Sequence, residues 1–158
     1  MRAMACLVLA MAVLAPAPEI CVGLAAPVDG PVVAGFAPIG RWAGHWGVDF
    51  GADPGTSVRA AGTGVVSFDG TVAGNRTVTI DHGGGLKTSY SYLETASAGP
   101  GRVMAGSVIA RSGRAHGSEA LHFSVRIDDV YIDPMSVLGC LPVDLTNALW
   151  LLPPPESR

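Results

Sequence analysis

Glycine and proline interrupt this chain so often that long regular elements have little room to form. The 158 residues include 21 glycines and 12 prolines, and these follow no collagen-like period. Both residue types weaken helices and central strands, and both are common in turns. A chain divided in this way is expected to fold into short strands that are joined by tight turns.

The stretches between these turn residues have the patterns of strands. Apolar and polar residues alternate from Leu121 to Ile127, which predicts a strand with one buried face and one exposed face. Residues 130–132 would complete a hairpin with this strand through Asp128-Asp129. No ten-residue stretch of the body shows a helical period, so the predicted fold is all-β, a split barrel or sandwich of short antiparallel strands. Further strand candidates are residues 63–68, which end at an Asp69-Gly70 turn signal, 77–81, 86–93 and 107–110.

The first 25 residues differ in composition from the rest. Ala3 to Ala15 is almost wholly apolar, and the small residues Gly23-Leu24-Ala25 offer a cleavage site. The apolar run is too short to span a bilayer, so residues 1–25 are predicted to be a signal peptide, with an uncleaved membrane anchor as the alternative. The protein is therefore expected to be secreted or held in the cell envelope, with no membrane span after cleavage. Residues 26–139 form the predicted β domain, and residues 140–158 form a C-terminal tail with a short apolar run before three prolines.

The charge and length of the chain limit its partners and its core. Ten basic and 13 acidic residues give a net charge of −3, and the basic residues are scattered. This excludes the basic surface that nucleic-acid binding requires. A chain of this length with 49% hydrophobic residues supports one modest core.

Three residues of the body have the chemistry of a zinc site. His45 and Asp49 are four residues apart, and His122 comes from a distant strand; imidazoles and a carboxylate together suit Zn²⁺. In a straight strand the first two side chains would stand about 13 Å apart. The segment must therefore bend, and Gly47 is where it can. His82, which follows a strand at a glycine-rich turn, is predicted to be structural.

The ordered motifs of residues 34–138 resemble the catalytic domain of lysostaphin-type zinc peptidoglycan endopeptidases, the LytM-like domain. His45-x-Gly47-x-Asp49 matches that family's first element, and Leu121-His122-Phe123 followed by Asp133-Pro134 matches its last. The resemblance implies the same all-β fold, a Zn²⁺ ion bound by His45, Asp49 and His122, and hydrolysis of peptidoglycan peptides. Between these elements lie counterparts of a Gly-Thr-x-Val-x-Ala segment at residues 55–60, a Gly-x-Val strand at 64–66 and a Val-x-Ile-x-His-Gly segment at 78–83.

Both histidines that assist catalysis in that family are replaced in this chain. Ala120 stands at the first position of the family's His-x-His motif, and Tyr92 stands where its Tyr-x-His-Leu element has histidine. Because residues 120 and 122 share a strand face, Ala120 is expected to leave open space beside the metal. Candidates for the missing catalytic groups are His116 and Glu119, in the loop before the His122 strand, and the Tyr92 hydroxyl. The alternative is that all three are ordinary loop or strand residues.

Two functions are consistent with these motifs. The first is an exported zinc metallo-endopeptidase that acts on peptidoglycan peptides, with an activity reduced by the two replacements. The second is a catalytically degenerate relative that binds peptidoglycan or regulates a partner cell-wall hydrolase. The replacements favour the second function, whereas the complete set of metal ligands favours the first. A lipoyl- or biotinyl-carrier domain is disfavoured because the only lysine, Lys87, has no carrier-like context.

Overall fold

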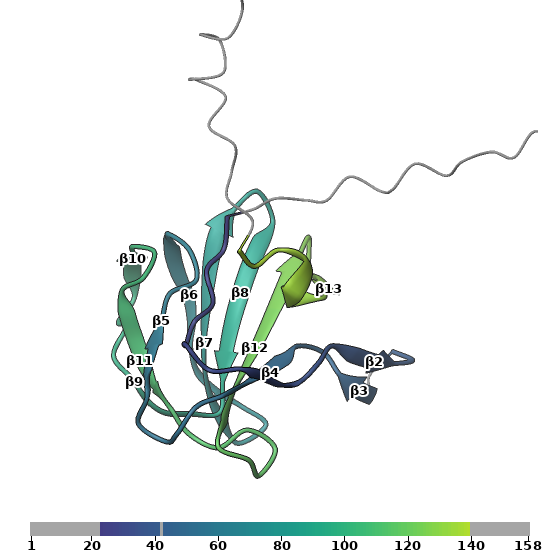
Figure 1. Ribbon diagram of the computed structural model, residues 1–158. Helices are drawn as coiled ribbons and strands as arrows, with labels where there is room; N and C mark the ends of the chain where they lie inside the picture. Colours follow the sequence, from purple (N-terminus) through teal and green to yellow (C-terminus); the bar gives the residue numbers. More distant parts are fainter. Residues whose placement is uncertain (1–22, 42, 140–158) are drawn as a thin grey trace, which may run out of the picture.

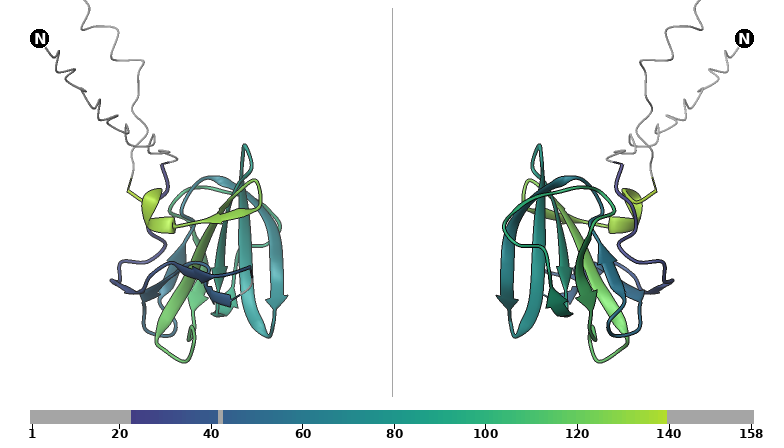
Figure 2. Two further views of the ribbon diagram at one scale, coloured as in Figure 1. Left: turned by 90° about the vertical axis from the view of Figure 1, so that its right-hand side faces the viewer. Right: turned by 90° about the vertical axis from the view of Figure 1, so that its left-hand side faces the viewer.

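The computed structural model describes residues 23–41 and 43–139, which form antiparallel sheets (Figures 1 and 2). The prediction of an all-β fold of short antiparallel strands is confirmed. The strands are β1 (Val32–Ala34), β2 (Ala37–Ile39), β3 (Ala43–His45), β4 (Val48–Gly51), β5 (Ser57–Arg59), β6 (Gly64–Val72), β7 (Asn75–Gly83), β8 (Leu86–Ser91), β9 (Leu93–Ala96), β10 (Gly101–Val103), β11 (Val108–Ser112), β12 (Ala120–Ile127) and β13 (Val130–Ile132), and a short 3-10 helix, η1 (Pro134–Ser136), follows.

The larger sheet carries most of the strands. Its order is β1-β4-β12-β8-β7-β6-β10, and β13 pairs with β12. The first half of β12 pairs with β4, and its second half pairs with β13. A second sheet has the order β5-β11-β9, and β2 with β3 forms a separate hairpin that projects to one side in Figure 1.

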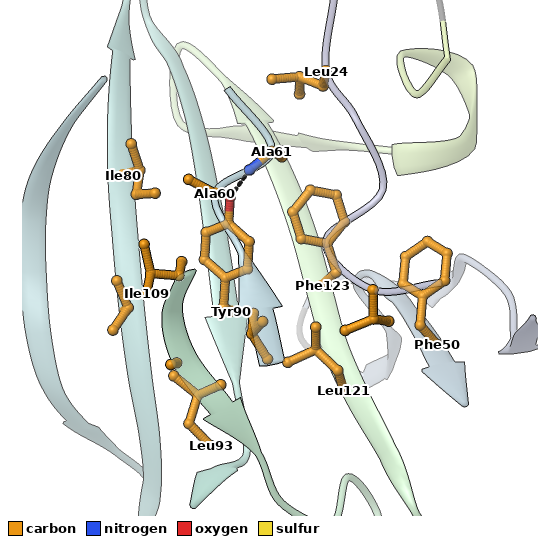
Figure 3. Close-up of a cluster of buried hydrophobic side chains, with 14 of the residues drawn as sticks. Leu24, Phe50, Ala60, Ala61, Ile80, Tyr90, Leu93, Ile109, Leu121 and Phe123 are labelled. Carbon is orange, nitrogen blue, oxygen red and sulfur yellow. Dashed lines mark hydrogen bonds between the residues drawn. The ribbon is translucent and has the colours of Figure 1, made fainter. Parts of the chain in front are cut away.

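The core lies between the larger sheet and the β5-β11-β9 sheet (Figure 3). The alternation predicted for β12 is observed, since Leu121, Phe123 and Val125 are all fully buried. The Phe123 ring packs against the rings of Tyr90 and Phe50, at centroid distances of 5.3 and 6.3 Å. The opposite face of β12, with His122, is therefore directed away from the core.

A chain of hydrogen bonds crosses this core. The Tyr90 hydroxyl accepts from the Ala61 backbone N–H at 2.7 Å (Figure 3) and from the Thr88 hydroxyl at 3.0 Å. Thr88 Oγ1 also lies 2.8 Å from His82 Nε2, whose Nδ1 lies 2.9 Å from the Thr63 carbonyl oxygen. Burial raises the pKa of Tyr90 to about 12, so the phenol stays protonated and keeps its place in the chain. His82 has both ring nitrogens engaged here, in agreement with a structural role.

The predicted turn at Asp69-Gly70 is wrong. Strand β6 continues through both residues, and the turn lies at Ala73-Gly74, which have φ values of 48° and 84°. Two positive φ angles are what a two-residue hairpin turn of type I′ requires. Asp69 is held within the hairpin by an ion pair with Arg76 at 2.7 Å.

The predicted strand over residues 86–93 is two strands. β8 ends at Ser91 and β9 begins at Leu93, because Tyr92 between them has a φ of 61°. The chain thus leaves the larger sheet at Tyr92 and enters the smaller one. This left-handed residue is one of the candidates for the site.

The two ends of the described chain lie beside each other (Figure 1). Leu24 and Leu138 form a parallel bridge, and the Gly139 N–H donates to the Leu24 carbonyl at 2.9 Å. Within the described residues, no helix is long and apolar enough to cross a membrane. Residues 1–22 of the predicted signal peptide and the predicted tail at 140–158 lie outside the described residues.

Replacing Leu24 by alanine is expected to lower the free energy of unfolding by about 2–5 kcal/mol, the usual cost of truncating a buried leucine. Leu24 is buried in the core although it lies within the predicted signal-peptide segment, so the measurement uses the full chain, in which this segment is retained. Urea unfolding followed by tryptophan fluorescence measures the change, and Val130→Ala, at an exposed position, is the control. An equal effect of both substitutions would contradict this packing.

Candidate metal centre

Two strands and the bend between them bring His45 and Asp49 together. β3 ends at His45, the chain bends at Trp46 and Gly47, and β4 begins at Val48. Val48 and Phe50 face the core, so Asp49 between them faces the opposite side. The bend expected from the sequence is therefore present.

Strand β12 supplies the third group. His122 pairs in register with Asp49 across β4 and β12. His122 Nδ1 lies 2.8 Å from Asp49 Oδ1 and 3.1 Å from His45 Nε2, and the latter two atoms are 3.0 Å apart. Ligands about 2.0–2.1 Å from a tetrahedral zinc ion lie about 3.3 Å from one another. The donor set and its spacing therefore fit one zinc ion.

A hydrogen bond to the backbone fixes the orientation of the His45 ring. Its Nδ1 donates to the Gly35 carbonyl oxygen at 2.7 Å, which leaves the lone pair of Nε2 directed at Asp49 and His122. A hydrogen bond to the far nitrogen of a ligating histidine typically sets its tautomer and ring orientation. Nothing in the sequence around Gly35 indicated this contribution, because a backbone carbonyl carries no residue signature.

Asp49 is held as a carboxylate. Burial acts to raise its pKa, but the hydrogen bond with His122 and the charges of His122, His45 and His116 together hold the pKa below its usual value. The side chain is thus anionic at neutral pH, the form in which it binds a metal.

A third histidine reaches the same point from a loop. His116 Nε2 lies 3.8 Å from Asp49 Oδ2, and its ring centroid is 5.3 Å from that of His45. One potential ligand atom from each of His45, Asp49, His116 and His122 lies within 4.8 Å of all the others. On its other side, His116 Nδ1 is 3.3 Å from the Tyr92 hydroxyl. Two of the three candidate catalytic groups therefore meet at the centre.

Glu119, the other candidate, lies elsewhere. Its carboxylate pairs with Arg114 at 2.7 Å, and its carbonyl accepts from the Ala52 N–H. Glu119 is three residues from His122, so the alternation of an extended chain directs it to the opposite face. Among the described residues, it is not part of the cluster around Asp49.

Position 120 does not offer the open space that the sequence predicted. Ala120 is fully buried, and its carbonyl accepts a hydrogen bond from the Ala115 N–H. The loop between β11 and β12 thus folds back against the start of β12. The same loop carries His116, which adopts a φ of 53°.

An open groove leads away from the centre along the outer face of the larger sheet. It has a volume of about 570 Å³ and begins at His122. Cross-strand pairing arranges the residues of its floor in three rows. Each row runs across β7, β8 and β12, and the rows follow one another along these strands. The rows are Thr77, Ser91 and His122, then Thr79, Ser89 and Ser124, and last Asp81, Lys87 and Arg126. Trp46 and Tyr131, with ring centroids 5.7 Å apart, line the groove on one side.

Gly47→Ala is expected to weaken metal binding and to destabilise the fold. A Cβ at this position would lie 2.5 Å from the Phe123 carbonyl oxygen and 2.8 Å from two atoms of the His122 ring, so the imidazole would have to move. Isothermal titration with zinc and thermal unfolding measure the two effects. Gly99→Ala is the matched control, because no atom lies within 4 Å of a Cβ there. A variant that binds zinc as tightly as the unaltered chain would contradict the close approach.

The fold and the centre together define a class: antiparallel β proteins in which two histidines and an aspartate that could hold a metal ion lie at one end of an open groove. The model of peptidase family M23 matches residues 43–134, which include every residue of this centre. The chain belongs to peptidase family M23. The prediction of a lysostaphin-type domain is thereby confirmed.

Individual relatives agree with this assignment. The chain is 38% identical over 111 residues to the DD-carboxypeptidase/endopeptidase Mpg of Neisseria meningitidis, a match that covers 68% of this chain and 25% of that protein. The chain thus corresponds to about a quarter of the length of this relative. A zinc-containing peptidase from Vibrio cholerae is 29% identical, with a TM-score of 0.64 over 76% of this chain and 41% of that one. Lysostaphin from Staphylococcus simulans, at 23% identity, shares the fold with a TM-score of 0.62 over 73% of this chain and 54% of its own.

Proposed function

We propose that this chain is an exported zinc metallo-endopeptidase that hydrolyses peptide bonds of bacterial cell-wall peptidoglycan. The observation that carries the proposal is the triangle of donor atoms from His45, Asp49 and His122 at one end of an open groove. The lysostaphin-type motifs and the name of the Neisseria relative support a cell-wall peptide as the substrate. The apolar segment from Ala3 to Ala15 supports export.

His45, Asp49 and His122 would hold the zinc ion. Three protein ligands are the number typical of catalytic zinc sites, where a fourth position remains for water or substrate. When bound, zinc supplies a Lewis acid that polarises a carbonyl and lowers the pKa of a coordinated water to about 7. Gly35 contributes by fixing the His45 ring through the Nδ1 hydrogen bond.

His116 is the group best placed to move a proton during peptide-bond hydrolysis. Its Nε2 faces the centre near Asp49, and its Nδ1 contacts the Tyr92 hydroxyl, which orients the ring. Its side chain is 47% exposed and lines a pocket with His45 and His122, so a substrate at the centre can reach it. The loop therefore provides the imidazole that the strand lacks at position 120. A positioned acid or base of this kind contributes about 10²–10⁴-fold to a rate.

One observation favours the second candidate function, a catalytically degenerate domain that binds peptidoglycan or a partner hydrolase. The four potential ligand atoms, His116 included, all lie within 4.8 Å of one another. Four protein ligands are typical of closed, structural zinc sites. With His116 as the fourth ligand, no position would remain for substrate. The role of His116 thus separates the two functions.

The release of new amino termini from purified peptidoglycan tests the proposal directly. The zinc-loaded chain is expected to release them, and a chelator or the substitution Asp49→Asn is expected to stop the reaction. Pull-down with insoluble peptidoglycan, measured in parallel, reports binding without hydrolysis. A chain that carries zinc and binds peptidoglycan but releases no amino termini would favour the second function.

A further inference from the structure

Arg126, in the last row of the groove floor, uses little of its hydrogen-bonding capacity. Arg126 lies on the same face of β12 as His122, and its side chain is only 25% exposed. Its guanidinium is 5.4 Å from the centre of the Tyr131 ring, which restricts its position. Its polar contacts are long: 3.5 Å to the Ser89 hydroxyl and 4.0 Å to Asp129 Oδ1.

The neighbouring charges leave Arg126 available. Lys87 donates to Asp129 Oδ1 at 3.0 Å, so this exposed carboxylate is already engaged. Asp81 accepts from the Gly83 N–H at 2.8 Å at the end of its own strand. A guanidinium has five N–H donors in a planar fork that matches a carboxylate. Arg126 therefore has donors to offer to an anion that enters the groove.

The distance from Arg126 to the metal centre determines how far from the scissile bond a substrate carboxylate must lie to reach Arg126. Arg126 and His122, the residue of the centre on the same strand, are four positions apart, so their Cα atoms are about 13 Å apart. An extended peptide covers this distance in about three or four residues. A terminal carboxylate directly next to the scissile bond, as in the removal of one C-terminal residue, would not reach Arg126.

We propose that Arg126 is a specificity-determining residue that binds a substrate carboxylate lying about three or four residues from the scissile bond. The Ser89 hydroxyl and the Tyr131 ring position the guanidinium, and the hydroxyl row between Arg126 and His122 lies under the intervening peptide. The inference rests on the proposed peptidase function. It assigns the chain to cleavage inside a peptide rather than at its last residue.

A ladder of zinc-anchored peptides measures this distance. Each compound carries a hydroxamate, which binds the metal, a spacer of one to six glycines in either chain direction, and a terminal carboxylate or carboxamide. Affinities for the zinc-loaded chain are measured by isothermal titration. We expect the carboxylate to bind at least about tenfold more tightly than the carboxamide at spacers of about three or four residues, and equally at one.

Three variants identify the residue responsible. Arg126→Gln is expected to abolish the carboxylate preference, and Arg102→Gln, an exposed arginine outside this groove, is expected to keep it. Asp129→Asn removes the negative charge 4.0 Å from the guanidinium, which would repel a substrate carboxylate, and is expected to increase the preference; asparagine tolerates the φ of 62° at this position.

The ladder distinguishes this inference from the proposed function, because it reports binding and needs no hydrolysis. A length-dependent preference that requires Arg126 supports the inference even in a chain that hydrolyses nothing. Equal affinities at all lengths, a preference that survives in Arg126→Gln, or a preference at one residue would each overturn it. Hydrolysis of peptidoglycan without any carboxylate preference would overturn the inference and leave the proposed function standing.

Discussion

Replacing His116 by alanine is expected to slow peptidoglycan hydrolysis by about 10²–10⁴-fold, because one positioned acid or base contributes this much to a rate. His116 is the one described imidazole beside the centre that is not part of the three-residue donor triangle. The zinc affinity should change little, since His45, Asp49 and His122 remain. Release of amino termini gives the rate, and competition with a chromogenic chelator gives the affinity.

The spectrum of the cobalt-substituted chain distinguishes catalysis by His116 from ligation by it. If His116 acts on protons, the cobalt absorption of His116→Ala should match that of the unaltered chain. If His116 is a fourth ligand, the spectrum and the affinity should both change, and the rate should rise when the ligand is removed. Tyr92→Phe, which removes the hydroxyl beside His116 Nδ1, is expected to slow hydrolysis less than His116→Ala. If Glu119→Gln stops hydrolysis and His116→Ala does not, Glu119 would be the catalytic group in place of His116.

His122→Ala is expected to weaken zinc binding by more than about a hundredfold, since losing even an outer-shell partner costs about 10–100-fold. The chain should then lose its hydrolytic activity and the thermal stabilisation that zinc gives to the folded state. Elemental analysis after dialysis and thermal unfolding with and without zinc measure the two losses.

His82→Ala is the matched control for this loss. It removes a histidine whose ring nitrogens contact Thr63 and Thr88, so it is expected to lower stability and to leave zinc content unchanged. Full zinc content in His122→Ala would show that the metal lies elsewhere.

Strand periodicity explains why the convergence of His45, Asp49 and His122 was predictable. Once β12 is recognised from its alternation, His122 must face away from the core, and a bend at Gly47 is the simplest way to bring His45 and Asp49 together. The predictions depended on local geometry and on motif order. Local geometry and motif order can both be read from the sequence without knowledge of the tertiary packing.

The surroundings of these three residues were less predictable, for physical reasons. His116 reaches the centre through a loop with an unusual φ, and the same loop buries Ala120, where the sequence predicted open space. The turn at Ala73-Gly74 was missed because Asp69-Gly70 carries a stronger local turn signal. Strands β1 to β5 were missed because each has only three or four residues and lies among glycines and prolines.

The β2–β3 hairpin is separate from the two larger sheets, and this has a consequence for how long the protein resists proteases. Within the described chain, this hairpin forms its sheet hydrogen bonds only internally, yet it ends in His45, one of the residues that would hold the metal. A bound ion would therefore fasten the hairpin to β12, 77 residues further along the chain. Without the ion, the hairpin is the segment that we expect to detach first and to be cut by proteases. In a metal-poor environment, zinc supply would then determine how long the protein persists as well as whether it works.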